Sequence, residues 1–249
     1  LRSEQPGGVC RVTEIVFLGR HDVGEEVYEW LCDRDDATVL AMLTRKEQLS
    51  VVEELDPDLV ISGGFRYIVP ESVLNLPGLG VVNMHGSYLP YNRGANTNVW
   101  PLVDGTPAGV SLHYMTAELD SGPIIDRRKV EKRPSDTASS LLTRIEREAL
   151  RQFKELWPAI RDDTVDTTPQ DPNDGTYHSR SEFVDLWELD LDESATYREV
   201  IDRLRALTHS PHNNAYFESN GERYFIDVSI TPAAEVEQSP GEYVDRYED

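Results

Sequence analysis

The stretch RVTEIVFL at residues 11–18, followed by GRHDVG at residues 19–24, decides the fold class. Apolar side chains follow one another almost without a break in the second half of the first stretch, which is typical of a strand covered on both faces of a sheet. Beyond the glycine-bounded turn, Val27, Trp30 and Leu31 recur at helical spacing. A strand, a tight turn and a helix in this order predict the first unit of an α/β sheet.

The alternation of strand and helix signals continues along the first 160 residues. Helices are predicted at residues 46–54 and 137–157, and the second is amphipathic, with Ser135 as its N-cap. Further strands are predicted at residues 38–43, 58–62, 81–83, 109–115 and 123–130. Strands that alternate with helices pair in parallel and carry the helices on the faces of the sheet. We therefore predict an α/β fold with a Rossmann-like, mostly parallel sheet and a small C-terminal α+β appendage.

The chain divides into four parts by composition. Residues 1–160 form the predicted main domain, and residues 161–174 form an exposed acidic connector. A helix and a hairpin that turns at Asn220-Gly221 are predicted within a small subdomain at residues 175–231. Residues 232–249 are again acidic, and we expect a loosely held tail.

The charge balance argues against a polyanionic partner. Among 249 residues there are 46 acidic and 24 basic side chains, which give a net charge of −22. Nucleic-acid binding draws on a basic face, so we expect no nucleic-acid partner. Only four of the bases are lysine. We interpret this surface as halophilic, since salt screens acidic self-repulsion. The alternative is an ordinary acidic protein of a GC-rich genome, and a KCl titration of folding distinguishes the two.

The sequence also predicts where the protein works. It has no apolar run of the ~18 residues that a membrane span needs, and residues 1–10 lack an apolar signal core. We expect a cytoplasmic protein without membrane contact. Cys10 and Cys32 are too few for a disulfide framework or a four-cysteine zinc site, so we expect reduced thiols. The histidines show no metal-ligand spacing, and we expect no metal.

Chemistry-bearing residues gather where two predicted strands end. In VNMHGSYLP at residues 82–90, period-two alternation places Asn83 and His85 on the same side of the strand. LDSGP at residues 119–123 places Asp120 on a turn. An amide, an imidazole and a carboxylate together provide an oxyanion donor, a proton carrier and an orienting charge, which acyl transfer requires. Each residue taken alone can equally be a turn residue or a buried histidine without catalytic role.

The order of these motifs resembles a known family. NMHGSYLP at 83–90, RG at 93–94, GVSLH at 109–113 and LDSGPI at 119–124 are similar to the motifs of the 10-formyltetrahydrofolate-dependent formyltransferases. That family includes the glycinamide ribonucleotide, methionyl-tRNA and sugar N-formyltransferases. The resemblance covers roughly residues 11–160. It implies that Asn83, His85 and Asp120 are the catalytic residues and that 10-formyltetrahydrofolate is the co-substrate.

The resemblance also implies which loops hold the folate. In this family the pterin ring lies between the loop after the third strand and the loop before the catalytic aspartate. The corresponding residues here are Phe65, Arg66, Tyr67, Ile68, Val69, Ala117, Glu118 and Leu119. For Phe65 alone, plain packing of a strand–helix junction is an equal alternative.

Among the possible amine substrates, a nucleotide-linked amino sugar fits best. The short acidic C-terminus is unsuited to tRNA, and a glycinamide ribonucleotide enzyme would not need residues 175–231. The stretch SYLPYNRGANTNVWP at 87–101 looks like the sugar N-formyltransferases. Arg93 and Asn96 are the predicted contacts to the sugar or its diphosphate, because a guanidinium can bind phosphate through two hydrogen bonds. The alternative for Arg93 is a structural role in a long loop.

The predicted reaction is direct attack of the sugar amine on the formyl carbon, with no covalent enzyme intermediate. Two other functions stay open, a methionyl-tRNA formyltransferase-like enzyme and a non-catalytic nucleotide-sugar-binding protein. The appendage offers a surface for a homodimer. We expect His113 to face a helix, and Tyr177 with His178 to lie in a surface turn.

Overall fold

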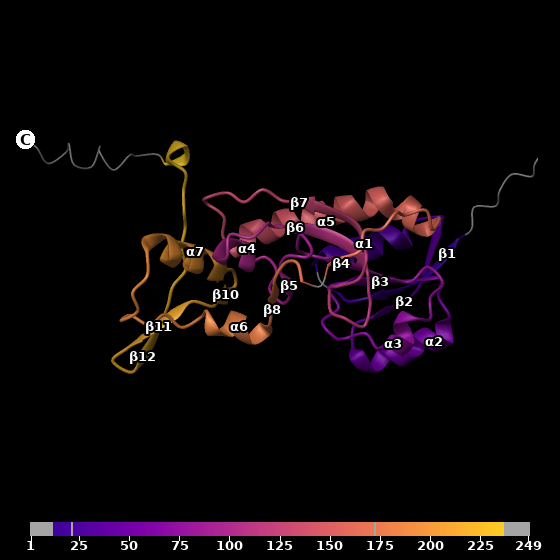
Figure 1. Ribbon diagram of the computed structural model, residues 1–249, viewed down its shortest axis with the longest axis horizontal. Helices are drawn as coiled ribbons and strands as arrows, with labels where there is room; N and C mark the ends of the chain where they lie inside the picture. The colour runs from indigo at the N-terminus through magenta and orange to yellow at the C-terminus, as the bar shows by residue number, and fades with distance from the viewer. Residues whose placement is uncertain (1–11, 21, 172, 237–249) are drawn as a thin grey trace, which may run out of the picture.

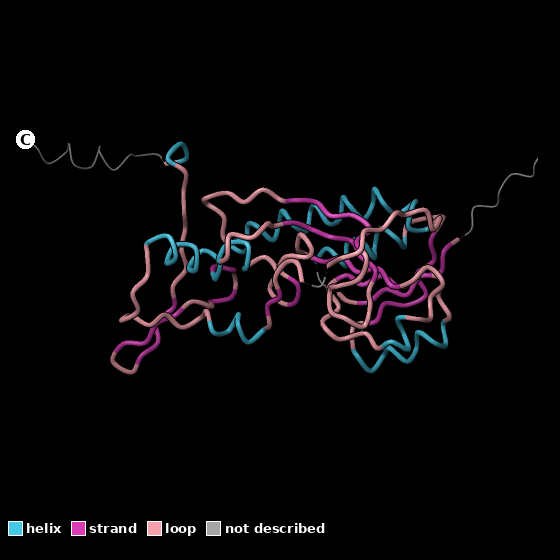
Figure 2. The backbone as a smooth tube through the Cα atoms, viewed as in Figure 1, coloured by secondary structure: helices cyan, strands magenta, loops and turns pink. Residues whose placement is uncertain are grey.

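The computed structural model describes residues 12–20, 22–171 and 173–236 (Figure 1). The predictions for residues 1–10, Cys10 among them, and for the acidic tail beyond residue 236 lie outside the described residues. One sheet and its covering helices form the larger part of the molecule, and the appendage lies at the other end of an elongated shape (Figure 2).

The central sheet has six strands in the order β2-β1-β3-β4-β6-β7. The first four strands pair in parallel, and β6 and β7 join in antiparallel fashion. This arrangement confirms the predicted α/β fold with a mostly parallel sheet. The strands are β1 (Thr13–Leu18), β2 (Ala37–Leu43), β3 (Leu59–Gly63), β4 (Val81–His85), β6 (Gly109–Tyr114) and β7 (Ile124–Lys129).

Alternating residues of β1 face two separate layers of helix. Ile15 and Phe17 belong to one buried cluster with side chains of α1 (Asp22–Cys32) and α5 (Ala138–Arg161). Val16 and Leu18 belong to a second cluster, and its helical part is η1 (Lys46–Ser50), α2 (Val51–Leu55) and α3 (Glu71–Leu74). Both faces of β1 are therefore buried, which explains its unbroken apolar run.

Helix α5 begins and ends later than the sequence predicts. Its N-cap is Thr137, whose hydroxyl accepts a hydrogen bond from the Ser140 amide at 3.3 Å, so the prediction of Ser135 was wrong. In return, the Thr137 amide donates to the Ser140 hydroxyl at 3.1 Å, and this reciprocal pair fixes the start of the helix. Beyond Pro158 the helix continues to Arg161, because Ile160 is buried in the core and Arg161 binds Asp36.

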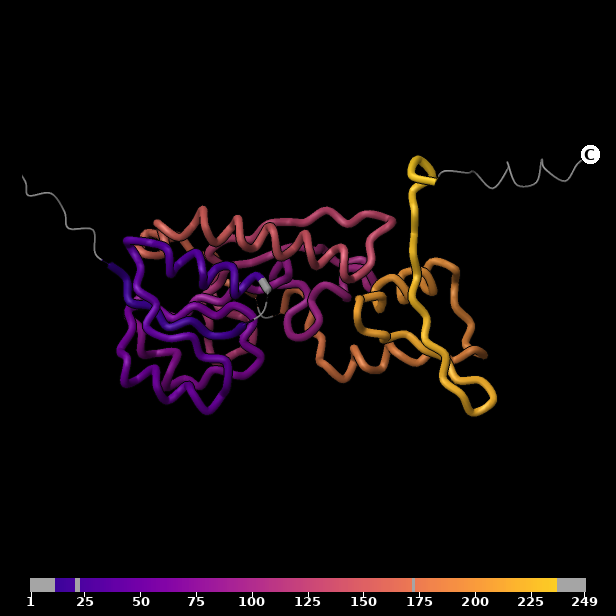
Figure 3. Tube along the Cα trace, turned by 180° about the vertical axis from the view of Figure 1, so that it is seen from behind, coloured from indigo at the N-terminus to yellow at the C-terminus, as the bar shows by residue number. Residues whose placement is uncertain are grey.

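The appendage packs against the segment that connects β4 to β6 and contains helix α4. Helix α7 lies against α4, and Ala206 and Leu207 are buried there. Figure 3 shows the appendage from behind. Its hairpin turns at Asn220 and Gly221, as predicted. The remaining elements are α4 (Trp100–Val103), α6 (Arg180–Asp185), α7 (Tyr197–Leu207), β5 (Arg93–Gly94), β8 (Tyr177–His178), β9 (Thr208–His209), β10 (His212–Asn213), β11 (Tyr216–Ser219), β12 (Glu222–Phe225) and η2 (Ala233–Glu235).

Within the described residues, no helix has both the length and the apolar character that crossing a bilayer requires.

A buried carboxylate joins β2 to the end of α5. Asp36 is 7% exposed and accepts hydrogen bonds from Arg34 at 2.5 and 2.8 Å, from the Trp157 indole at 3.2 Å and from Arg161. The hydrogen bonds from Arg34 lower the pKa of Asp36 to about 2, although burial acts in the opposite direction. The charged form of this side chain therefore stabilises the folded protein at neutral pH.

Replacing Asp36 by asparagine should lower the free energy of unfolding at pH 7 by about 2 to 4 kcal/mol, because two guanidinium groups lose their shared anion. The pKa of Asp36 is lower in the folded than in the unfolded state. Its stabilisation is therefore complete above pH ~4 and disappears as the pH falls toward 2. Urea unfolding of the wild type and of Asp36→Asn at pH 7 and at low pH checks this. The exposed neighbour is the control: if Asp33→Asn costs as much as Asp36→Asn, the assignment is wrong.

Candidate active site

The three predicted catalytic residues meet at the carboxyl end of β4. Asn83 and His85 lie within the last three residues of that strand, and Asp120 follows β6 on a turn. The Nδ1 atom of His85 lies 3.6 Å from Oδ1 of Asp120, and each of these two residues is 9% exposed. The second carboxylate oxygen of Asp120 accepts a hydrogen bond from the Gly94 amide at 2.9 Å. The structure thus brings together residues that are 37 positions apart in the chain.

A fourth residue, His113, lies between Asn83 and Asp120. Antiparallel pairing of β4 with β6 places His113 directly opposite Asn83. Its Nε2 atom is 3.1 Å from Nδ2 of Asn83 and 3.8 Å from Oδ1 of Asp120. The prediction that His113 faces a helix is wrong, since the side chain lies in this cluster and is 1% exposed.

His113 is neutral, and its neighbours fix its tautomer. Burial lowers the pKa of His113 to about 4, and the nearby His85 ring acts in the same direction. The Nδ1 atom is 2.9 Å from the carbonyl oxygen of Tyr114, which can only accept, so Nδ1 carries the hydrogen. The Nε2 atom then has a lone pair and accepts one of the two amide hydrogens of Asn83. This contact orients the Asn83 amide with its nitrogen toward the cluster.

The loop after β4 holds His85 from its other side. The Nε2 atom of His85 is 3.4 Å from the carbonyl oxygen of Asn92. Asn92 is fully buried, its amide nitrogen donates to Pro107, and its amide oxygen accepts from Thr106 and Thr176. Because the Asn92 side chain is fixed by these contacts, its carbonyl is a rigid partner for the imidazole.

The two predicted substrate contacts differ in their surroundings. Arg93 donates to the Ser121 hydroxyl at 3.2 Å and to the Asp174 carbonyl at 2.7 Å, so it links three loops. Asn96 is partly buried and adopts a left-handed conformation with φ 56°. These contacts agree with the alternative role of Arg93, which is to hold a long loop in place.

His178 is packed rather than exposed in a surface turn. Its ring stacks on the indole of Trp100, with centroids 3.9 Å apart and planes 8° apart. Its Nε2 atom is 3.2 Å from a carboxylate oxygen of Asp104. Tyr177 and His178 form β8, which pairs with β5 in the loop after β4. Tyr177 itself is 56% exposed.

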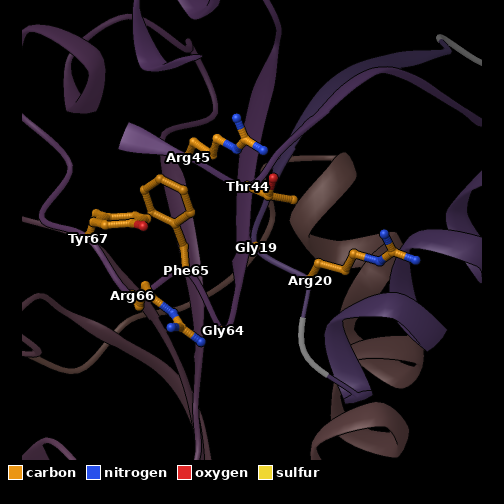
Figure 4. A pocket seen from close by; sticks show the side chains of 8 residues that line it. All are labelled: Gly19, Arg20, Thr44, Arg45, Gly64, Phe65, Arg66 and Tyr67. Carbon is orange, nitrogen blue, oxygen red and sulfur yellow. The ribbon is translucent and has the colours of Figure 1, made fainter. Parts of the chain in front are cut away.

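A pocket opens at the carboxyl ends of β1, β2 and β3, next to β4 in the sheet (Figure 4). It has a volume of about 280 Å³, and its lining includes three arginines and no acidic residue. Gly19 forms part of the floor, where a Cβ atom would lie 2.4 Å from the carbonyl oxygen of Gly63. The lining residues are Gly19, Arg20, Thr44, Arg45, Gly64, Phe65, Arg66 and Tyr67.

The predicted folate residues fall into three groups. Phe65, Arg66 and Tyr67 line this pocket. Ile68 is 76% exposed, whereas Val69 is 3% exposed and packs in the core below the loop. The second predicted loop, residues 117–119, is exposed beside Asp120 and lies outside the pocket lining. Among the described residues, no three His, Cys, Asp or Glu side chains are placed to hold a metal ion.

Two family models match this chain. Residues 34–155 match the model for formyl transferase, and residues 182–232 match the model for the N-formyltransferase dimerization C-terminal domain. A dTDP-4-amino-4,6-dideoxyglucose formyltransferase from Mycobacterium tuberculosis is 34% identical over 179 residues, which are 70% of this chain and 74% of that protein.

Solved structures show the same fold. A 4-N formyltransferase from Francisella tularensis superposes with a TM-score of 0.79 at 23% identity, covering 88% of this chain and 98% of the other. A formyltransferase from Anoxybacillus kamchatkensis, in complex with UDP-4,6-dideoxy-4-formamido-L-AltNAc and tetrahydrofolate, has a TM-score of 0.63 at 27% identity. It covers 78% of this chain and 98% of its own. With its motifs, fold and relatives in agreement, the chain belongs to the formyl transferase family.

Proposed function

We propose that this protein transfers the formyl group of 10-formyltetrahydrofolate to the amino group of a nucleotide-linked amino sugar. The observation that carries the proposal is the cluster of Asn83, His85, His113 and Asp120 at the carboxyl end of β4. This is the end of an open α/β sheet at which ligands bind. The relatives named above support the substrate class, since one acts on a dTDP-linked amino sugar and another holds a UDP-linked formamido sugar with tetrahydrofolate.

The cluster can supply each group that direct transfer needs. The neutral sugar amine attacks the formyl carbon, a new C–N bond forms, and the carbonyl oxygen becomes an oxyanion. Asn83 donates its second amide hydrogen to that oxygen, while His113 keeps the first. His85 carries the proton from the attacking nitrogen toward N10 of the folate, and the bond from N10 to the formyl carbon breaks. Asp120 balances the positive charge that develops on the nitrogen and on the imidazole.

Asn83→Ala should lower turnover on the order of 10² to 10³-fold, because one oxyanion donor is lost. The assay offers 10-formyltetrahydrofolate and a panel of nucleotide-linked amino sugars, with methionyl-tRNA as a further acceptor, in high salt. Mass spectrometry should show one formyl group added to a single amino sugar by the wild type. The exposed Asn75→Ala is the matched control and should keep wild-type turnover. Formylation of the tRNA alone, or undiminished turnover by Asn83→Ala, would refute the proposal.

The arginine pocket fits the anionic part of the sugar nucleotide. Its volume of about 280 Å³ is below that of a typical whole-ligand site, so it suits one end of a ligand. The lining has three arginines and no acid, although Arg20 also pairs with Glu25 at 3.3 Å, outside the lining. In a chain with net charge −22, such a lining favours a dianion such as a diphosphate. The glutamate carboxylates of the folate offer the same chemistry. We keep the Phe65–Tyr67 wall, with Arg66, as the predicted contact to the folate. Beyond the predicted sugar contacts of Arg93 and Asn96, we assign the Arg45 side of the pocket to the diphosphate.

Arg45→Gln should raise KM for the sugar nucleotide by about tenfold or more, since a phosphate loses a charged donor, and should leave KM for the folate within about twofold. Initial rates with each co-substrate varied in turn measure the two constants. Arg151→Gln, an exposed arginine on α5, is the control. A rise confined to KM for the folate would assign the pocket to the glutamate tail instead.

We also propose that the chain forms a homodimer through the appendage. Large apolar side chains of residues 182–232 face solvent, and Tyr197 and Ile201 on α7 are 91% and 49% exposed. These two residues are four positions apart and so lie on one face of the helix. Leu191 and Phe225 are 64% and 53% exposed. The match of residues 182–232 to a dimerization domain supports a second copy as the occupant of this surface.

The double variant Tyr197→Glu/Ile201→Glu should be monomeric, because two carboxylates would have to be desolvated in an apolar interface. Sedimentation at micromolar concentration should give twice the chain mass for the wild type and the single chain mass for the variant. Ser194→Glu, an exposed polar site just before α7, is the control and should stay dimeric. A monomeric wild type would rule out this interface.

A further inference from the structure

The segment between the two matched domains touches the active site. Residues 168–171 and 173–178, here the bridging segment, belong to neither family match. Thr168 exchanges two backbone hydrogen bonds of 2.8 Å with Ile124 at the start of β7. Farther along, Thr176 bonds the backbone of Asn92 and Arg93. The bridging segment therefore spans from the edge of the sheet to the loop after β4.

Gln170 of this segment binds the backbone of the Asp120 turn. Its side-chain nitrogen donates to the carbonyl oxygens of Asp120, at 3.0 Å, and of Gly122, at 2.7 Å. A carbonyl can only accept, so only the nitrogen end of the amide can occupy this position. Gln170 thereby uses both of its amide hydrogens on the turn that carries the carboxylate.

The Asp120 turn needs such support because its backbone is unusual. Asp120 adopts φ 51°, in the left-handed region that costs a residue with a side chain free energy. Gly122 lies so close to β6 that a Cβ atom would be 1.8 Å from the carbonyl oxygen of Tyr114. A strained conformation persists only where its surroundings determine it. Gln170 holds the two carbonyls on either side of Ser121 and so fixes the direction in which the Asp120 side chain points.

Small errors in that direction matter at the site. Asp120 faces His85 at 3.6 Å and His113 at 3.8 Å through one oxygen, and the Gly94 amide holds the other. A displacement of about 1 Å can cost on the order of 10² in rate. We propose that Gln170 is a positioning residue for formyl transfer, which acts by holding the Asp120 turn in its catalytic geometry. This inference rests on the role proposed for Asp120.

The test is a double-mutant cycle between Gln170 and Asp120. Gln170→Ala should lower kcat about 10- to 100-fold and leave both KM values within about twofold, since neither substrate touches Gln170 in this scheme. In the Asp120→Asn background, measured in single turnover at high enzyme concentration, the same substitution should change the rate by no more than about twofold. Gln170→Met keeps the bulk without the donors and should behave as Gln170→Ala does. It serves also as the informative variant if Gln170→Ala does not fold.

The control and the contrary outcomes separate this inference from the proposed function. Asn173→Ala lies in the same segment, where its side chain bonds only Asp171 among the contacts described, and it should keep wild-type kcat. Equal losses from Gln170→Ala in both backgrounds, or a loss confined to KM, would overturn the positioning role. Asp120→Asn with undiminished kcat would instead overturn the role of Asp120, and a wild type inactive on every amino sugar would overturn the proposed function.

Discussion

The antiparallel register of β4 with β6 is the constraint on which the candidate active site depends. It sets Asn83 opposite His113 and His85 opposite Ser111. A shift by one residue would turn all of these side chains to the other face of the sheet. The register also explains why a buried histidine stays uncharged here. His113 must accept from Asn83 at one nitrogen and donate to Tyr114 at the other, and only the neutral ring can do both. The free-energy cost of burying the charged imidazolium keeps the ring neutral and therefore secures the orientation of Asn83, the proposed oxyanion donor.

The proposed catalytic groups come from three segments, and separate loops hold each one in place. Ser111 accepts from the Leu89 amide and donates to the Ser87 carbonyl, which ties the loop after β4 to the neighbouring strand. The Gly94 amide binds Asp120, so the same loop reaches the second segment. The bridging segment then holds both loops from outside through Gln170 and Thr176. Because most of these contacts involve backbone atoms, we expect substitutions of exposed side chains to leave the geometry of the site unchanged.

Local patterns were sufficient for the sheet and, together with the family resemblance, for three of the four residues of the site. The apolar run of residues 15–18 predicted β1, and alternation alone put Asn83 and His85 on one side of β4. His113 was missed because its role depends on pairing between two strands that are distant in sequence. The available signal was the Ser-x-His spacing of residues 111–113, which matches the Asn-x-His spacing of residues 83–85 on the strand that pairs with it. Gln170 gave no signal, since its partners are carbonyl groups that every residue carries. The N-cap of α5 was displaced from Ser135 to Thr137 by the reciprocal bond with Ser140, a choice between two good capping residues.

Because acidic residues outnumber basic ones in this chain, the positions of its basic side chains matter for binding anions. With a net charge of −22, the long-range field of the protein repels both anionic co-substrates, and this repulsion slows their encounter when salt is low. At physiological ionic strength the Debye length is about 8 Å, so distant carboxylates are screened while contacts within the pocket are not. In the binding mode that we propose, a diphosphate therefore depends on short-range contacts with the arginines of the pocket. Other arginines bind buried carboxylates instead. Arg34 and Arg161 bind Asp36, and Arg144 binds Asp136. These structural arginines therefore differ from those that line the pocket. Salt screens the surface charges and so favours association with the substrates, while the buried ion pairs are screened much less and persist.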